Sequence, residues 1–369
     1  MADVVTVFVP RERTEGERRV AQVPDTVARL VKAGLQVQVE SGAGVASGYA
    51  DADFEKAGAK VVRDRDEALR TAAVVLKVQP PDDGERALLR AGALVVSFLP
   101  AVLRPSFAEA KVDALAMERV PRTTRGQAAD ALSSQATVAG YKAVLMGADR
   151  LPRLLPMMTT AAGTLTPGRV LVLGAGVAGL QAVATAHRLG AVVTAFDVRA
   201  AAKEQVLSLG AKFLEVEGVA SAEGQGGYAK EVASDEQARI LSTLGKAVPQ
   251  ADLVVSTAAI PGKAAPRLIT SAMVAQMRNG SVIVDLAAES GGNCELTRVG
   301  ETVLTDNGVT VLGPRQLASH MPFHGSAMYA RNVATLLQWC VKDGQLELNL
   351  ADDVIAAMLV THQGAVRHA

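Results

Sequence analysis

Short, continuous apolar runs alternate along the chain with stretches in which apolar residues recur every three or four positions. The N-terminal runs are short and rich in β-branched residues, which is typical of buried strands. The strands predicted there are Val4–Pro10, Gln36–Glu40, Lys60–Arg63, Ala73–Gln79, Ala93–Pro100 and Ala114–Val120, and the helices between them include Asp25–Ala33, Asp82–Arg90 and Phe107–Asp113. Strands that alternate with helices predict a parallel sheet covered on both faces.

A second series of strands follows a long helical pattern at Ala131–Arg150. It predicts a six-stranded doubly wound sheet, with strands Arg169–Leu173, Ala191–Asp197, Lys212–Val216, Ala251–Thr257, Ser281–Leu286 and Val309–Leu312. A helix at Ser326–Val341 and a tail long enough to return to the first sheet come next. We therefore predict an α/β fold of two Rossmann-like doubly wound parallel-sheet domains. The N-terminal domain is discontinuous, residues 1–133 with 322–369, and the second domain is 134–321.

The turn after the first strand of the second series carries the pattern Gly174-x-Gly176-x-x-Gly179. Gly174 allows a tight turn, Gly176 lets the backbone approach a pyrophosphate, and Gly179 lets the helix pack closely on the strand. The diphosphate is expected on the N–H groups of the helix start, where Val177 and Ala178 lie. The alternative is a βαβ unit whose glycines serve packing alone.

An acidic residue, Asp197, stands at the end of the next predicted strand. A carboxylate there accepts hydrogen bonds from a ribose diol, which makes residues 134–321 an NAD-binding Rossmann domain. It also disfavours a 2′-phosphate, because two anions at about 4 Å repel by roughly 1–4 kcal/mol between bulk-water and near-surface dielectrics. Val198 and Arg199 follow and are also predicted to contact the cofactor. The Arg199 side chain either folds back to reduce the repulsion or is solvated.

A polar segment precedes the long helix. It contains Arg122, Gln127, Asp130 and Ser133, whose guanidinium, amide, carboxylate and hydroxyl groups suit a ligand held between two domains. Asp130 is also expected to cap the helix N-terminus. Arg122 and Arg125 could instead both be solvated.

Three further features are expected near the nucleotide. The glycine-rich segment 217–230 ends with Gly227 and Tyr228 and is either a lid that closes on a ligand or a surface excursion. Ala258 and Glu289 follow the fourth and fifth strands of the second sheet. In doubly wound sheets, ligands bind at this carboxyl edge.

The composition excludes several classes of partner. Lys and Arg together number 38, as do Asp and Glu, so no net charge favours nucleic acid or an acidic membrane. Cys294 and Cys340 have no metal-type spacing, and we expect reduced thiols in a cytoplasmic protein and no metal site. The longest mostly apolar run, Ala93–Leu103, is too short to span a bilayer, and the N-terminus has no secretory pattern. Direct membrane insertion is therefore not expected, and any link to a membrane runs through a partner.

Nearly the whole chain resembles the alanine dehydrogenase and transhydrogenase superfamily. Besides the glycine turn, the motifs that carry this resemblance are Pro10–Glu12, Gly16–Ala21, Glu40–Gly44, Leu76–Val78, Met157–Thr164 and Asp285–Gly292. Segments 121–135, 139–141, 197–205 and 226–231 are similar to the NAD(H)-binding domain of proton-translocating nicotinamide nucleotide transhydrogenases. These segments are specific to the transhydrogenase branch.

Two positions depart from the alanine dehydrogenase pattern. Those enzymes have a catalytic histidine where this chain has Pro100, and an aspartate where it has Glu289. Lys77 and Arg19 do match their substrate-binding pair, so an amino-acid site stays open. Oxidising an amine needs a proton acceptor, whereas hydride transfer between two nicotinamides needs position rather than general acid–base chemistry. The missing histidine therefore fits a second substrate that is itself a nicotinamide.

The resemblance implies a chain that binds NAD(H) and passes hydride to NADP⁺ held on a partner domain. Its other implied partners are membrane-spanning subunits and a second copy of itself, at the cytoplasmic face of the inner membrane. It places Arg122, Gln127, Asp130 and Ser133 around the nicotinamide and its ribose, and Tyr228 on a mobile loop. The alternatives are an alanine-dehydrogenase-like NAD-dependent amino-acid dehydrogenase and a non-catalytic NAD-binding module.

Overall fold

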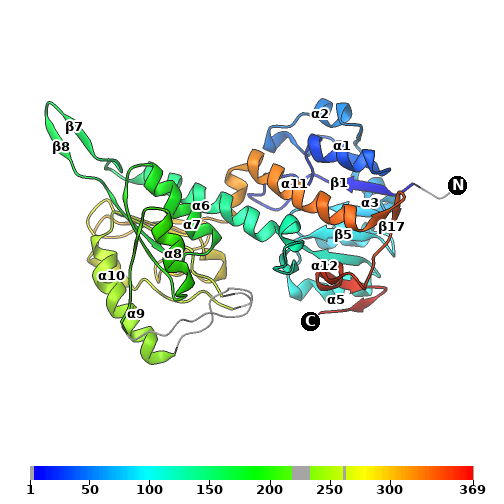
Figure 1. Cartoon of the computed structure of the whole chain (residues 1–369). Helices are drawn as coiled ribbons and strands as arrows, with labels where there is room; N and C mark the ends of the chain where they lie inside the picture. The colour runs from blue at the N-terminus through cyan, green and yellow to red at the C-terminus, as the bar shows by residue number, and fades with distance from the viewer. Residues whose placement is uncertain (1–3, 218–232, 261–262, 369) are drawn as a thin grey trace. The chain divides into compact units, whose positions relative to one another are not determined.

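The structure is a computed structural model that describes residues 4–217, 233–260 and 263–368. The chain divides into two compact units, which we call unit 1 (Met1–Gln135 with Ala318–Ala369) and unit 2 (Ala136–Leu317). Each unit holds one large sheet with helices on its faces (Figure 1). Among the described residues, no helix is both long and apolar enough to cross a membrane.

Unit 1 is built on an eight-stranded sheet in the order β19-β18-β6-β5-β4-β1-β2-β3. Its strands are β1 (Thr6–Val9), β2 (Gln36–Glu40), β3 (Lys60–Val62), β4 (Val74–Leu76), β5 (Leu94–Ser97), β6 (Asp113–Ala116), β18 (Leu359–His362) and β19 (Ala365–Val366). The six predicted strands are all present and parallel. The C-terminal segment completes the sheet, as predicted, but β18 and β19 run antiparallel at its edge.

Helices cover both faces of this sheet. They are α1 (Pro24–Lys32), α2 (Asp51–Lys56), α3 (Arg65–Thr71), α4 (Asp83–Leu88), α5 (Arg104–Glu109), α11 (Pro322–Trp339) and α12 (Asp353–Met358). On β1 the apolar side chains alternate, since Val7 and Val9 join one hydrophobic cluster and Phe8 joins the other. The helix predicted at Phe107–Asp113 was wrong in its bounds: Lys111 has a positive φ of 54°, which ends the helix before β6 begins.

Unit 2 is built on a seven-stranded sheet in the order β11-β10-β9-β12-β13-β15-β14. Its strands are β9 (Arg169–Leu173), β10 (Val192–Phe196), β11 (Lys212–Phe213), β12 (Leu253–Ser256), β13 (Val282–Asp285), β14 (Thr302–Leu304) and β15 (Thr310–Leu312). The six predicted strands are parallel and in doubly wound order. The predicted count was wrong, because β14 adds an antiparallel strand at the edge. The strand order reverses between β9 and β12, and ligands bind at such switch points.

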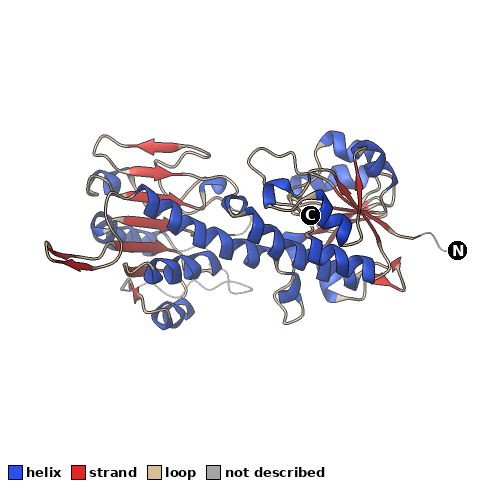
Figure 2. Ribbon diagram, turned by 90° about the horizontal axis from the view of Figure 1, so that it is seen from above, coloured by secondary structure: helices blue, strands red, loops and turns tan. Residues whose placement is uncertain are grey.

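The helices of unit 2 lie on both faces of its sheet, as the view in Figure 2 shows. They are α7 (Val177–Arg188), α8 (Ala201–Ser208), α9 (Ser234–Ala247), α10 (Ser271–Ala275) and most of α6 (Ala131–Arg150), the helix in which the boundary between the units falls. Along β9, Val170 and Val172 join one hydrophobic cluster while Leu171 and Leu173 join the other. Buried on both faces, β9 is the centre of the unit.

A separate hairpin of β7 (Met158–Thr160) and β8 (Gly163–Leu165) extends beyond the rest of unit 2 (Figure 1). Every residue of its two strands is exposed. The segment before it packs on glycines that precede strands: Leu155 lies against Gly168, and Pro156 against Gly190. The hairpin therefore leaves unit 2 from the amino edge of its sheet.

Candidate functional site

The turn after β9 uses each of its three glycines for a different steric reason. Gly174 has a φ of +92°, and a Cβ there would lie 2.8 Å from the Thr257 hydroxyl. A Cβ on Gly179 would overlap the carbonyl oxygen of Gly174, so helix α7 can approach the turn only without a side chain at this position. Around Gly176, in contrast, a Cβ would meet no atom within 4 Å. Gly176 therefore faces the space through which a ligand can reach the backbone.

The first turn of α7 presents backbone donors to the same space. Gly176 is the N-cap residue, and the first helical hydrogen bond runs from the Leu180 N–H to the Gly176 carbonyl at 2.8 Å. The amides of Val177, Ala178 and Gly179 precede that bond and have no helical acceptor. Together with the helix dipole they form a site for an anion such as a pyrophosphate.

Asp197, directly after β10, lies beside this turn. Its Oδ2 accepts the Ala175 N–H at 2.7 Å. Its two oxygens also accept the Arg199 backbone N–H at 2.8 Å and, at 2.9 Å each, the Nε–H and a terminal N–H of the Arg199 guanidinium. The alternative of a solvated Arg199 was wrong: the side chain folds back and is 17% exposed. The charge of the ribose acceptor is thus compensated within the chain.

The end of β12 completes the carboxyl edge through residues that the sequence did not single out. The Thr257 hydroxyl donates to the Gly174 carbonyl at 3.0 Å, which ties this strand end to the glycine turn. Asn293 is fully buried, and its side chain bonds both the N–H of Ala258 at 3.1 Å and its C=O at 2.8 Å. Ala258 therefore has its backbone fixed, and only its methyl group is left to face a ligand.

Asp285, the last residue of β13, organises the loop that supplies Asn293. It is fully buried, and its carboxylate accepts the N–H groups of Ala287, Asn293 and Cys294 and the Thr297 hydroxyl at 2.7–3.0 Å. Burial raises the pKa of the Cys294 thiol to about 11, so this thiol stays protonated and unreactive near neutral pH.

The two remaining predicted contacts of unit 2 differ in exposure. Glu289 is exposed on a short 3₁₀ segment, Ala288–Ser290, and accepts the Gln316 N–H at 3.0 Å. Val198 is partly buried against the hydrophobic cluster on one face of the sheet. Gly227 and Tyr228, predicted on the lid, lie outside the described residues.

In unit 1, the polar segment before α6 is a tight loop with a capped helix start. Asp130 accepts the Ser133 N–H at 2.9 Å and the Ser133 hydroxyl at 2.5 Å, as expected of an N-cap. A Cβ on Gly126 would overlap the Pro121 carbonyl, so the loop needs glycine there. Gln127 is exposed and is held by its backbone N–H, which donates to the loop. Arg122 is exposed on the same loop.

Arg125 anchors this loop and is not solvated. Its guanidinium forms an ion pair with Asp352 and lies 4.5 Å from the ring centroid of Trp339. Both partners belong to the C-terminal segment of unit 1. The alternative of a solvated side chain was therefore wrong for Arg125, which acts in positioning the loop.

The cations that match an amino-acid site are both in internal ion pairs. The Lys77 ammonium group lies 2.8 Å from Glu85 and 3.4 Å from Glu12, and Arg19 lies 2.6 Å from Glu17. All five side chains are buried. Burial raises the pKa of the Glu12 carboxyl and lowers the pKa of the Lys77 ammonium group. Both positive charges are compensated by carboxylates of the chain itself.

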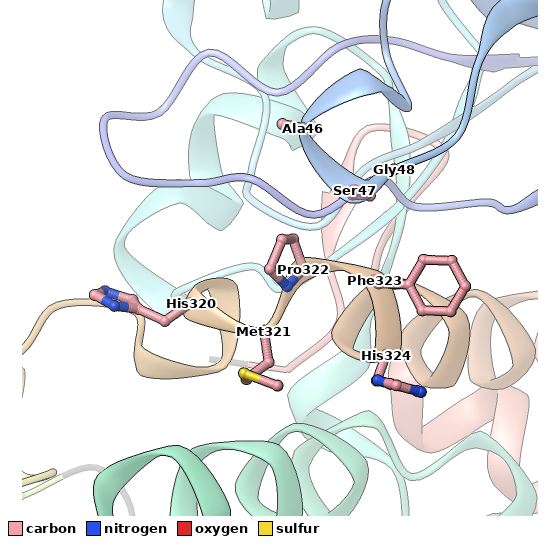
Figure 3. Close-up of a pocket in the computed structure, with 8 residues that line it drawn as sticks. All are labelled: Ala46, Ser47, Gly48, His320, Met321, Pro322, Phe323 and His324. Atoms are coloured by element: carbon pink, nitrogen blue, oxygen red, sulfur yellow. The ribbon is translucent and has the colours of Figure 1, made fainter. Parts of the chain in front are cut away.

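A cavity of about 290 Å³ lies elsewhere in unit 1, where α11 begins. It is lined by Ala46–Gly48 and residues 320–324, including His320 and His324, whose role the sequence leaves open. The imidazoles of these two residues point in different directions (Figure 3). They do not converge on a common ligand.

The structure thus groups the predicted residues in two sets. Unit 2 brings the turn Gly174–Gly179, Asp197, Arg199 and Ala258 to the carboxyl edge of its sheet. Unit 1 brings Arg122 and Gln127 to one loop, with Asp130 and Ser133 at the helix start that follows.

Comparison with known proteins places both units in one family. The models of the alanine dehydrogenase/PNT N-terminal and C-terminal domains match residues 8–139 and 143–369. The first of the polypeptides that make up the NAD(P) transhydrogenase subunit alpha of Rhodospirillum rubrum is 45% identical over 98% of this chain and 97% of its own length. The structure of a transhydrogenase from Sinorhizobium meliloti has a TM-score of 0.89 at 42% identity, covering 98% of this chain and 99% of that one. An alanine dehydrogenase of Mycobacterium tuberculosis is 33% identical over 79% of this chain and 75% of its own length.

The fold and the glycine turn define a two-domain α/β protein of the nicotinamide nucleotide-binding class. The chain belongs to the alanine dehydrogenase/PNT family. Within that family it is more similar to the transhydrogenase alpha subunits than to the alanine dehydrogenases, both in identity and in the share of the chain that matches.

Proposed function

We propose that this chain is the NAD(H)-binding component of a proton-translocating nicotinamide nucleotide transhydrogenase. The hydride leaves C4 of the dihydronicotinamide of NADH and adds to C4 of the nicotinamide of NADP⁺, giving NAD⁺ and NADPH with no proton released at the reacting carbons. The observation that carries this proposal is a dinucleotide-type turn in a chain that has Pro100 after β5, in place of an acid–base histidine. The names of the transhydrogenase relatives support it.

The residue roles follow from the two sets. The N–H groups of Val177, Ala178 and Gly179 bind the pyrophosphate, and Asp197 accepts the adenosine ribose hydroxyls. Ala258 bounds the same edge of the sheet. In unit 1 the Asp130–Ser133 cap and the loop with Arg122 and Gln127 hold the nicotinamide and its ribose. The four unit 1 residues supply position rather than a proton acceptor.

The residues with less geometric support keep their proposed roles as cofactor contacts. Val198 and Arg199 follow Asp197, and Glu289 follows β13. Gly227 and Tyr228 are proposed to close over the bound nucleotide. NADP(H) is held by a separate partner domain, and membrane-spanning subunits couple the transfer to proton movement. This places the chain at the cytoplasmic face of the inner membrane, attached through its partners.

The decisive experiment mixes this chain with the NADP-binding domain of a transhydrogenase. With NADH and an oxidised NADP analogue present, we expect reduction of the analogue at the expense of NADH. Binding of NADH without any transfer would support the NAD-binding module instead.

The alanine dehydrogenase alternative is tested in the same preparation. The carboxylate of an amino acid would have to compete with Glu85 and Glu17 for Lys77 and Arg19. We expect no turnover with NAD⁺ and L-alanine, or with NADH, pyruvate and ammonium. Sustained turnover in either direction would contradict the proposed function.

We also propose that the chain forms a homodimer through the β7–β8 hairpin. Met157, Met158 and Leu165 are 65%, 45% and 54% exposed, and an isolated two-stranded hairpin is marginally stable in water. Exposed apolar groups gathered on one element mark a protein interface. A hydride-accepting partner must approach the carboxyl edge of the unit 2 sheet, whereas the hairpin leaves from the amino edge. The occupant that remains is a second copy of this chain.

Placing charges on the hairpin is expected to dissociate the dimer. In the double variant Met158→Asp and Leu165→Asp, two carboxylates would have to be desolvated at the interface, which costs several kcal/mol. Sedimentation or light scattering should show a monomer, while NADH binding is retained. The matched control is the pair Thr159→Asp and Thr164→Asp, which adds the same charge at positions that were already polar. An unchanged dimer in the Met158 and Leu165 variant would exclude the hairpin as the interface.

Removing the Asp197 carboxylate is expected to weaken NADH binding and to narrow its preference over NADPH. Asp197→Ala deletes the acceptor for the ribose hydroxyls and the negative charge that repels a 2′-phosphate. A loss of about tenfold in NADH affinity corresponds to one charge-assisted hydrogen bond of about 1.5 kcal/mol. Equilibrium titration with both nucleotides measures the change. An unaltered preference would remove Asp197 from the site.

A further inference from the structure

The Asp197 carboxylate has no acceptor position left for a ribose. A carboxylate offers about four lone-pair sites, and four hydrogen bonds already reach the two Asp197 oxygens. Two of these come from backbone N–H groups, those of Ala175 and Arg199, and two from the Arg199 guanidinium. A ribose diol brings two further donors. Something must leave before they can bind.

Only the guanidinium can leave without disturbing the fold. The Ala175 N–H is part of the glycine turn, and the Arg199 N–H belongs to the segment between β10 and α8. The Arg199 side chain is attached to neither strand nor helix, and its 17% exposure leaves it a path to water. The guanidinium and the ribose hydroxyls are therefore alternative donors to the same two oxygens.

We propose that Arg199 is a specificity-determining residue that competes with the adenosine ribose for Asp197 and reduces the discrimination between NADH and NADPH. This inference rests on the proposed NAD(H) site. The side chain closes the carboxylate with a bidentate ion pair, and NADH binding exchanges that pair for two hydroxyl donors. Arg199 thus lowers the affinity for NADH below what the turn and Asp197 alone would give.

The same exchange affects NADPH in the opposite direction. A lone carboxylate repels a 2′-phosphate, while a guanidinium that stays nearby offsets that repulsion and can pair with the phosphate oxygens. Keeping Arg199 beside Asp197 therefore makes the site more tolerant of the 2′-phosphate. Removing the guanidinium should separate the two nucleotides further.

The test is Arg199→Gln in the full chain, titrated with NADH and with NADPH. Releasing a partly exposed ion pair is worth about two- to fivefold, so NADH should bind tighter by that factor. NADPH should bind more weakly, and the preference for NADH should rise by about tenfold. Arg199→Lys, which keeps the charge and loses the fork, should fall between the two.

The matched control is Arg188→Gln. Arg188 is exposed at the last turn of α7, so the substitution removes one positive charge at the end of the helix opposite the nucleotide turn. This control should leave the preference unchanged. A second readout compares ADP with 2′-deoxy-ADP: the gain in Arg199→Gln should be present for ADP and smaller for the deoxy analogue, which has one hydroxyl fewer to donate.

Three outcomes would overturn the inference. Weaker NADH binding in Arg199→Gln than in Arg188→Gln would make Arg199 a direct contact, and an unchanged preference would deny it any role in discrimination. Equal gains for ADP and 2′-deoxy-ADP would remove the ribose from the competition. Failure of hydride transfer to a partner domain would leave these titrations standing and would count against the proposed function. Absence of NADH binding to the unsubstituted chain would overturn both.

Discussion

Replacing Gly176 with alanine is expected to lower the affinity for NADH by about 10- to 100-fold, with little change in stability. The added methyl group meets no atom of the protein within 4 Å, and the backbone at Gly176, with φ −74° and ψ −168°, suits any residue. The methyl group instead occupies the approach of the pyrophosphate to the first turn of α7. Losing one charge-assisted hydrogen bond, worth about 1.5–3 kcal/mol, accounts for the range. Isothermal titration with NADH and a thermal melt measure the two effects.

Two other glycines provide the controls. Gly179→Ala should lower both stability and affinity, because its methyl group overlaps the Gly174 carbonyl and helix α7 has to move. Gly245→Ala, in the last turns of α9, places a methyl group 3.8 Å from Met273 and should leave NADH binding intact. Unchanged NADH binding in Gly176→Ala would show that the pyrophosphate does not lie at this turn.

The largest effect on rate is expected from Gln127→Ala. The side chain is exposed on the loop before α6, and its loss leaves the Asp130 cap and the Arg125 anchor in place. One neutral hydrogen bond is worth about 0.5–1.5 kcal/mol, so NADH affinity should stay within about tenfold. Hydride transfer to an NADP domain should slow by about 100-fold, because a displacement of about 1 Å at the reacting carbons has that cost. Single-turnover kinetics with saturating nucleotides separates the two quantities.

The control for that substitution lies in the same loop. Thr124→Ala changes an exposed neighbour and should alter neither affinity nor rate. Equal transfer rates for Gln127→Ala and the unsubstituted chain would remove the loop from the nicotinamide site.

Most of the fold could be predicted because its parallel strands are buried on both faces. Such strands are continuous β-branched runs, and all of those predicted are present. The edges could not be predicted in the same way. β14, β18 and β19 are short antiparallel strands with partly exposed residues, and such strands lack a continuous apolar run. Their place is set by the neighbour they pair with.

The candidate site was predictable where one local segment carries the chemistry. The glycine turn and Asp197 follow consecutive strands, so the sequence shows them together. Thr257, Asn293 and Asp285 were missed because their roles depend on distant partners. Thr257 bonds a residue 83 positions away, and Asn293 one 35 positions away. The side chains of Arg125 and Arg199 were undecided for a related reason, since an arginine near a loop does not show which carboxylate it will meet.

The arrangement of unit 1 bears on how the chain is made. Strand β18 pairs with β6, and the Thr361 hydroxyl bonds the Val112 carbonyl across 249 residues. Unit 2 is continuous and leaves the ribosome before the residues that complete unit 1. The nascent chain can therefore form its nucleotide-binding unit first, while the edge of β6 waits uncovered. A delay in translation near the 3′ end of the message would prolong that exposure, and strand edges of this kind are where chains associate wrongly.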